Sequence, residues 1–96
     1  LIVTARIERY REDTENWLRR HGIAWQRLVM HPATTLRERQ QEDIAAFKAW
    51  HYSQWASKHK ARPGPTIFCE SEDRQARRIA QISKHMVICP HTAGVY

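Results

Sequence analysis

Four short apolar segments alternate along this chain with stretches of helical periodicity, and this alternation is the strongest constraint on its fold. The segments lie at 1–4, 27–30, 65–69 and 86–89, and each is too short for a buried helix. Short apolar strands that alternate with helices favour a parallel sheet with right-handed crossovers. We therefore expect one α/β domain over residues 1–96, a three-layer parallel sheet of order β-α-β-α-β-α-β.

The segments between the strands have the sequence signatures of helices. Helices are expected between Ile7 and Gly22, from about Glu42 to Lys58, and over Glu72–Ile82. Gly22 should end the first helix in a left-handed cap, with Ile23 folding back over the last turn. In the second helix, the buried stripe is expected to be Ile44, Phe47, His51 and Trp55. Residues 31–41 are expected to form a polar connection, and residues 58–65 a basic loop.

The chain is small and basic. It has 16 Lys and Arg against 10 Asp and Glu, a formal net charge of +6. No acidic residue lies between Asp43 and Glu70, so the positive field is concentrated there. Such a field attracts phosphate-bearing partners. Nucleic acid is therefore a candidate partner, although basicity alone does not separate nucleic-acid binding from other roles.

Neither a membrane span nor a disulfide framework is expected. No segment approaches the roughly 18 apolar residues of a membrane-spanning helix, and the first residues lack the apolar region of a signal peptide. Cys69 and Cys89 are the two cysteines, too few for a disulfide scaffold and suited to a reducing compartment. We therefore expect a cytoplasmic protein without membrane contact.

Polar residues that follow the predicted strands are the candidate site residues, because ligands of parallel α/β sheets bind at the carboxyl ends of the strands. Thr4 and Arg6 follow the first strand, and Glu70 to Asp73 follow the third. Lys48 lies in the predicted second helix beside its apolar stripe, which is an unusual position for a lysine.

These segments resemble the haloacid dehalogenase-like (HAD) phosphohydrolases, and in particular small phage and bacterial members related to the phosphatase half of polynucleotide kinase. Val3-Thr4-Ala5-Arg6 is similar to the second motif, whose hydroxyl binds the transferred phosphoryl group. Phe47-Lys48-Ala49 is similar to the third motif, whose lysine neutralises phosphate and the nucleophile. Ile67-Phe68-Cys69-Glu70-Ser71 is similar to the fourth-motif strand, whose acids hold magnesium.

The resemblance covers nearly all 96 residues and implies a Rossmannoid fold. It also implies roles for individual residues. Thr4, Arg6 and Lys48 would bind phosphate, and Glu70 and Asp73 would bind Mg²⁺.

The nucleophile of that family is missing from this sequence. Active members begin with a strand that ends in Asp-x-Asp, whose first aspartate attacks phosphorus. Asp13, Asp43 and Asp73 are the three aspartates, and none ends an apolar strand in that arrangement. Without a carboxylate nucleophile and a second carboxyl for proton transfer, we expect no hydrolysis by the chain alone.

The missing strand also leaves an incomplete HAD-like domain. In the family it lies between the strands that correspond to residues 1–4 and 66–70. Unpaired buried backbone groups cost about 1–3 kcal/mol each, so compensation is expected. Either the two flanking strands pair directly, or another polypeptide fills the gap: a preceding segment, a second copy or a foreign partner.

Two functions remain open. The first is a basic binding or interaction protein on a HAD-like remnant, not catalytic by itself, of phage or mobile-element origin and acting on a protein or nucleoprotein partner. The second is the C-terminal part of a magnesium-dependent phosphatase that acts on nucleotide or nucleic-acid phosphate ends, with its nucleophile supplied by another segment or partner. Mg²⁺ would be a cofactor only in the second.

Each candidate residue also has a purely structural explanation. Thr4 can simply end a strand, and Lys48 can extend along a helix surface. Glu72 and Asp73 can stabilise a helix N-terminus. Aromatic residues of the second helix can be core residues, or they can join nearby cations in a stacking and phosphate-binding surface. That nucleic-acid or partner surface would consist of Trp50, Tyr52, Trp55, Lys58, Lys60 and Arg62.

Overall fold

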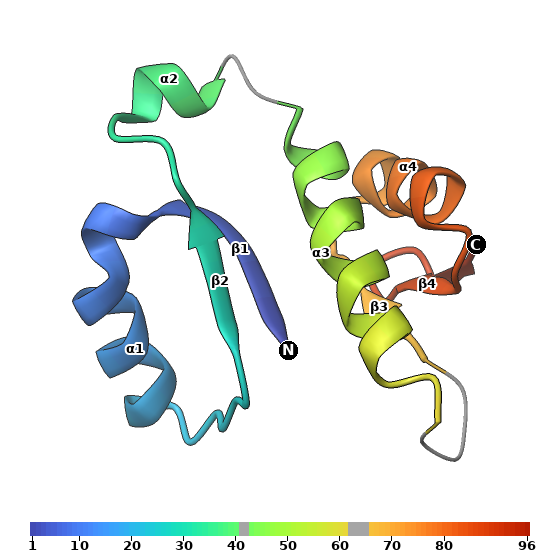
Figure 1. Ribbon diagram of the computed structural model, residues 1–96, viewed down its shortest axis with the longest axis horizontal. Helices are drawn as coiled ribbons and strands as arrows, with labels where there is room; N and C mark the ends of the chain where they lie inside the picture. The colour runs from blue at the N-terminus through green and yellow to red at the C-terminus, as the bar shows by residue number, and fades with distance from the viewer. Residues whose placement is uncertain (41–42, 62–65) are drawn as a thin grey trace. The chain divides into compact units, whose positions relative to one another are not determined.

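A computed structural model describes residues 1–40, 43–61 and 66–96. The chain divides into two compact units, Leu1–Glu42 and Asp43–Tyr96. The elements follow in the order β1 (Ile2–Ile7), η1 (Glu8–Tyr10), α1 (Arg11–Arg20), β2 (Leu28–His31), α2 (Leu36–Gln40), α3 (Ile44–Lys58), β3 (Phe68–Cys69), α4 (Asp73–Ser83), β4 (Val87–Cys89) and β5 (Gly94–Val95) (Figure 1). We call the first unit 1 and the second unit 2.

The predicted three-layer parallel sheet is wrong. In the described ranges the strands form two sheets, β1 with β2 and β3 with β4 and β5. Pairs β1–β2 and β3–β4 are parallel, whereas β5 returns antiparallel to β4. The physical reason is that the alternation of strands and helices does not specify which strands pair, so it does not require the β1–β2 pair and the β3–β4 pair to join in one sheet. The resulting fold is a small mixed α/β arrangement.

Unit 1 packs α1 against alternate residues of β2. Ile2 pairs with Leu28 and Val3 with Val29, and the register becomes irregular before Ile7. Leu28 and Met30 share one face of the strand because side chains alternate. These two form a buried cluster with Leu18 of α1, and Ile2 and Trp25 pack against it.

The predicted cap at the end of α1 is confirmed. Gly22 has φ +69°, a left-handed conformation that glycine adopts without penalty from a side chain. Its N–H donates to the carbonyl of Arg19 at 3.1 Å, and the N–H of Ile23 donates to the carbonyl of Leu18 at 2.9 Å. These two bonds make the Schellman motif, which satisfies carbonyls at the helix end.

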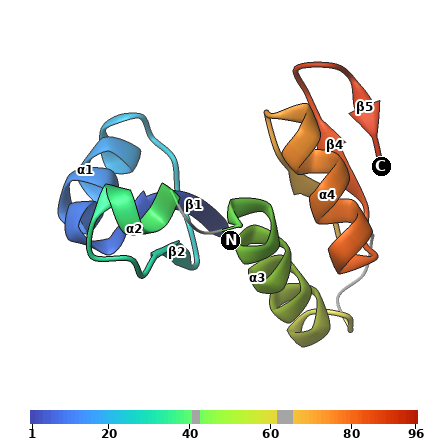
Figure 2. The same ribbon diagram turned by 90° about the horizontal axis from the view of Figure 1, so that it is seen from above.

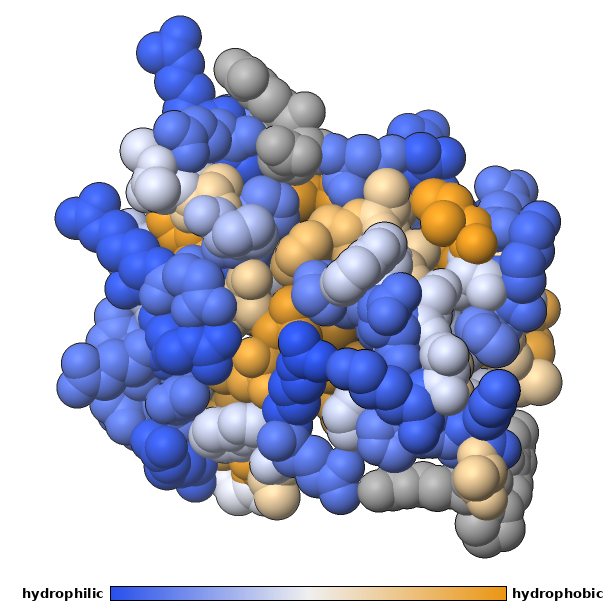
Figure 3. All heavy atoms as spheres, in the orientation of Figure 1, coloured by the Kyte–Doolittle hydropathy of each residue, from blue (hydrophilic) through white to orange (hydrophobic). Residues whose placement is uncertain are grey.

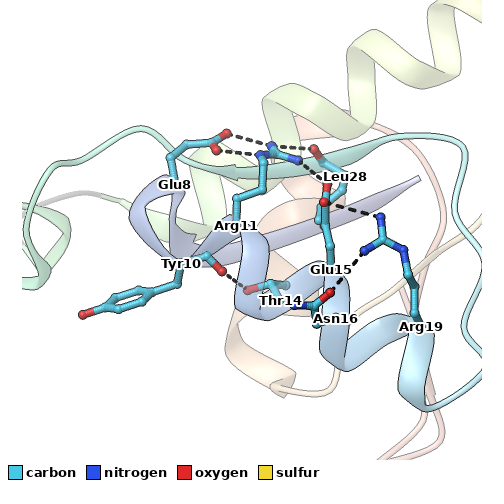
Figure 4. A network of polar contacts seen from close by, with 8 residues as sticks. All are labelled: Glu8, Tyr10, Arg11, Thr14, Glu15, Asn16, Arg19 and Leu28. Atoms are coloured by element: carbon cyan, nitrogen blue, oxygen red, sulfur yellow. Dashed lines mark hydrogen bonds and ion pairs between the residues drawn. The ribbon is translucent and has the colours of Figure 1, made fainter.

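A polar network fixes the start of α1 to β2 (Figure 4). The guanidinium of Arg11 donates to both carboxylate oxygens of Glu8, at 2.7 and 2.8 Å. It also donates to the backbone carbonyl of Leu28 at 3.0 Å. The Thr14 hydroxyl donates to the carbonyl of Tyr10 at 2.8 Å. The predicted first helix therefore begins at Arg11, after a 3-10 turn.

Unit 2 has a core shared by α3, α4 and β4 (Figure 2). Four alanines allow the two helices to approach closely, and Tyr52, Ile79, Val87 and Cys89 fill the remaining space. The buried members are Ala45, Ala49, Tyr52, Ala56, Ala76, Ile79, Val87 and Cys89. The most buried stripe of α3 is therefore shifted by one or two positions from the predicted stripe, whose members are only half-buried. Apolar residues occur all around this helix, so periodicity alone does not select a face.

Side chains cap both helices of unit 2. The carboxylate of Asp43 accepts from the N–H of Ala46 at 3.0 Å. The carboxylate of Glu72 accepts from the N–H groups of Arg74 and Gln75, at 3.1 and 2.8 Å. Both are acidic N-caps, which are favoured by these hydrogen bonds to free N–H groups and by the helix dipole. The positions predicted for these two helices agree with α3 and α4 within two residues at their starts.

The sequence interpretation missed α2 and β5. Thr35 and Glu38 mark the start of α2 with the spacing of a capping box. The Thr35 hydroxyl accepts from the N–H of Glu38 at 3.1 Å, and the Glu38 carboxylate accepts from Thr34. This signal was present within the segment predicted as a polar connection. No helix in the described ranges has the length and apolar character needed to cross a membrane.

Candidate functional site

A buried ion pair lies where β3 ends. The Lys48 ammonium donates to Oε1 of Glu70 at 2.6 Å, and the two side chains are only 12% and 8% exposed. Lys48 also donates to Oε1 of Gln75 at 3.0 Å. The second carboxylate oxygen of Glu70 accepts from the N–H of Glu72 at 3.2 Å. The middle of α3, the end of β3 and the first turn of α4 therefore meet at this pair.

The backbone places Glu70 at this position. Its N–H donates to the carbonyl of Ile88 at 3.0 Å, so the pairing of β3 with β4 continues to this residue. The Glu70 carboxylate is then held in a largely dry environment, where an unpaired charge would be costly. Lys48, 22 residues earlier in the chain, supplies the opposite charge. The structure thus brings together two of the predicted site residues.

This arrangement has capacity for a further acceptor. A lysine ammonium has three N–H donors, and within the described residues Glu70 and Gln75 accept from Lys48. The Glu70 carboxylate is a hard oxygen ligand of the kind that Mg²⁺ prefers. The pair is electrically neutral, and a magnesium–phosphate unit is close to neutral as well. If Lys48 and Glu70 left each other to contact phosphate and Mg²⁺ respectively, the site would stay close to neutral.

Asp73 takes part in a different network. Its carboxylate accepts from the Tyr96 hydroxyl, from Nε of Arg77 at 2.8 Å and from the Thr92 hydroxyl at 3.0 Å. These bonds, the one from Tyr96 first, lower the pKa of Asp73 to about 2. Among the described residues, Asp73 and Glu70 share no hydrogen-bond partner. In the part of the chain that the structure describes, no group of three or more His, Cys, Asp or Glu is placed to hold a metal ion.

The Asp73 network predicts a pH dependence. Its folded-state pKa is about 2 and the ordinary value is 3.8, so the ionised carboxylate stabilises the folded state above about pH 4. This contribution is lost as the pH falls toward about 2. We expect wild-type stability, measured by urea denaturation, to fall more steeply over this interval than that of Asp73→Asn. Tyr96→Phe removes the hydrogen bond that lowers the pKa of Asp73 most, so its pH dependence of stability should lie between those of wild type and Asp73→Asn. Equal slopes for wild type and Asp73→Asn would contradict this assignment.

Thr4 and Arg6 belong to unit 1. β1 continues past the predicted end at Thr4 to Ile7, whose buried side chain anchors the strand. Thr4 therefore lies within β1, in the interval where the register is irregular. Its hydroxyl accepts from the backbone N–H of Arg6 at 3.2 Å. Arg6 itself is exposed.

The predicted aromatic and basic surface is wrong for Tyr52. This side chain is 1% exposed, and its hydroxyl lies 2.7 Å from the carbonyl oxygen of Met86 and 3.1 Å from that of Thr66. Burial raises the pKa of Tyr52, and the residue belongs to the core because α3 turns it toward β3 and the start of β4. Trp50 is 58% exposed. Lys58 and Lys60 are exposed, on a protein whose visible face is mostly hydrophilic (Figure 3).

Trp55 is half-buried, and Arg62 lies outside the described residues. Trp55 belongs to a helix-ending contact that the sequence interpretation missed. Its ring stacks on His59 with 3.9 Å between centroids, and Nδ1 of His59 lies 2.8 Å from the Trp55 carbonyl oxygen. Trp17 and His21 make the same contact at the end of α1, with a centroid separation of 4.2 Å. The shared signal is Trp-x-x-x-His at a helix end. One face of each indole is thereby covered by a residue of its own unit.

Comparison with known proteins adds no relative. No protein-family model, no curated protein and no solved structure matches this chain. The resemblance to HAD-like phosphohydrolases therefore stays a prediction.

Proposed function

We propose that the chain is the phosphate- and magnesium-binding part of a magnesium-dependent HAD phosphatase that acts on nucleotide or nucleic-acid phosphate ends. The observation that supports this most is the buried pair of Lys48 and Glu70 at the end of β3. Lysine and carboxylate are the residue types that the resemblance implies there, and they come from segments far apart in the sequence.

In this proposal the pair opens when substrate binds. Lys48 donates to the phosphate oxygens and offsets their charge, while Glu70 is the carboxylate for Mg²⁺, which would orient the phosphoryl group and stabilise its charge. The phosphate-binding roles that the resemblance implies for Thr4 and Arg6, which belong to unit 1, stay predictions. Asp73 would become a metal ligand only by leaving Arg77 and Tyr96, so Glu70 is the principal carboxylate.

The nucleophile must come from outside these 96 residues. Asp13 lies within α1, Asp43 caps α3 and Asp73 is the first residue of α4. None of the three directly follows a strand of the described ranges. In the described residues β1 and β3 each have a strand partner along one edge, so each has a second edge to which a strand carrying the nucleophile could pair.

A phosphatase assay tests this proposal. The 96-residue chain is assayed with a 3′-phosphorylated oligonucleotide and Mg²⁺, alone and after extension by the segment encoded directly before Leu1. We expect no turnover by the chain alone. The extension should contain an apolar strand ending in Asp-x-Asp and should give magnesium-dependent hydrolysis. Lys48→Met should abolish this hydrolysis under conditions where circular dichroism shows the variant to be folded. Hydrolysis by the unextended chain, or activity that survives Lys48→Met, would overturn the proposal.

The open strand edges favour a second candidate, a binding protein without catalysis. An exposed edge presents unpaired N–H and C=O groups that another polypeptide can pair with. In this case the extended chain stays inactive and the unextended chain associates with a second copy or a foreign strand. Sedimentation equilibrium distinguishes pairing with a second copy from pairing with a foreign strand, since a stable monomer excludes self-pairing.

A further inference from the structure

A groove of about 420 Å³ lies between the C-terminal half of α4 and the residue that follows β5. It is lined by Arg77, Ala80, Gln81, Lys84 and Tyr96. None of these described lining residues is acidic, and two are cations. The groove is largely open to solvent. The groove shares no lining residue with the Lys48–Glu70 pair, so a ligand can bind here whether or not the proposed function holds.

Arg77 is held in a defined orientation in this groove. Its Nε donates to Asp73 at 2.8 Å, and its guanidinium lies over the Tyr96 ring, 4.3 Å from the centroid. Tyr96 is fixed in turn, because its N–H and carbonyl both pair with Val87, at 2.8 and 3.0 Å. The bond to Asp73 uses Nε, so that carboxylate does not occupy the two terminal amino groups. A preorganised guanidinium loses less entropy on binding and can hold two phosphate oxygens at once.

Lys84 supplies the second cation from a strained backbone position. It is the C-cap of α4 with φ +62°, a left-handed conformation for which glycine or asparagine is the usual choice. Its N–H donates to the carbonyl of Ala80 at 3.0 Å. A lysine at such a position is destabilising relative to glycine. The side chain is exposed at the groove. Binding an anionic ligand would explain why a lysine occupies this backbone position.

We propose that this groove binds a small phosphate monoester. The phosphate would lie between the Arg77 fork and the Lys84 ammonium. Asp73 already balances the charge of Arg77, so Lys84 supplies the uncompensated positive charge and Arg77 supplies directed donors. Ala80 and the Tyr96 ring give the groove an apolar wall for the organic part of the ligand. Gln81 offers both a donor and an acceptor for a hydroxyl or amide group on that part.

Titration of the full chain, followed residue by residue by NMR, tests this site with inorganic phosphate and phenyl phosphate as probes. We expect saturable shifts at Arg77, Lys84 and Tyr96, with phenyl phosphate binding at least about threefold more tightly because its ring meets the apolar wall. Shifts that spread over all basic residues without saturation would overturn the proposal. Shifts confined to Lys48 and Glu70 would also overturn it, while supporting the proposed function.

Lys84→Gly separates binding from folding. It removes the cation and relieves the left-handed strain, so we expect a higher urea midpoint together with about fivefold weaker phosphate binding. Arg74→Ala is the matched control, because Arg74 is an exposed cation of the same helix that does not line the groove. It should change the affinity by less than about twofold. Equal losses in the two variants would mean that phosphate senses only the net charge, and the proposal would be wrong.

Discussion

The Lys48→Ala variant is expected to lose about 3–5 kcal/mol of unfolding free energy, because it leaves the carboxylate of Glu70 buried without a cation. Glu70 is 8% exposed and Lys48 is its only ion-pair partner within the described residues. Small domains have about 5–15 kcal/mol in total. The variant should therefore be near the limit of folding, as measured by urea denaturation followed by circular dichroism.

Two controls make this test specific to the ion pair. Lys58→Ala removes an exposed lysine of the same helix and should change the unfolding free energy by no more than about 0.5 kcal/mol. The double variant Lys48→Met with Glu70→Leu removes both charges and should regain most of the lost stability, since well-packed apolar residues commonly replace a buried pair without loss. A loss below about 1 kcal/mol for Lys48→Ala would show that Glu70 reaches water without its partner.

The second large effect is expected from Ile79→Ala, at about 2–5 kcal/mol. Ile79 is 0% exposed and belongs to the cluster that joins α3, α4 and β4. Its truncation removes buried methyl groups and leaves a cavity between elements that are already closely packed through alanines. The alanine side chains are too short to fill the space.

Ile82→Ala provides the matched control on the same helix. Ile82 is 41% exposed, so the same truncation should cost less than about 1 kcal/mol. Urea denaturation of both variants, with amide hydrogen exchange of α4, gives the comparison. Equal losses at the two positions would mean that Ile79 is not a core residue and that the packing of unit 2 is different.

Local signals in the sequence predicted α1, α3 and α4, although α2 was missed. Gly22 ended α1 where a left-handed residue was expected, and the acidic N-caps at Asp43 and Glu72 mark the starts of α3 and α4. These features depend on residues within one or two turns. The pairing of strands does not, since it requires long-range choices that a pattern of short apolar segments leaves open. The single parallel sheet was wrong for this reason.

The contacts of the candidate site residues also depend on long-range packing. The resemblance implied roles for Lys48 and Glu70 but predicted no ion pair between them, and neither spacing nor composition alone would have paired them. The partners of Asp73 were not foreseen, because Thr92 and Tyr96 approach it only after β5 turns back along β4. Tyr52 was misplaced because α3 is apolar on more than one face.

The central claim is that Lys48 and Glu70 form a joint site for phosphate and magnesium. Calorimetric titration of the chain with inorganic phosphate, with and without Mg²⁺, tests it most directly, in the wild type and in Glu70→Gln. We predict that Mg²⁺ strengthens phosphate binding by about tenfold in the wild type, since the cation bridges carboxylate and phosphate. The effect should disappear in a folded Glu70→Gln variant. Phosphate affinity that Mg²⁺ leaves unchanged, or a magnesium effect that persists in Glu70→Gln, would contradict the account.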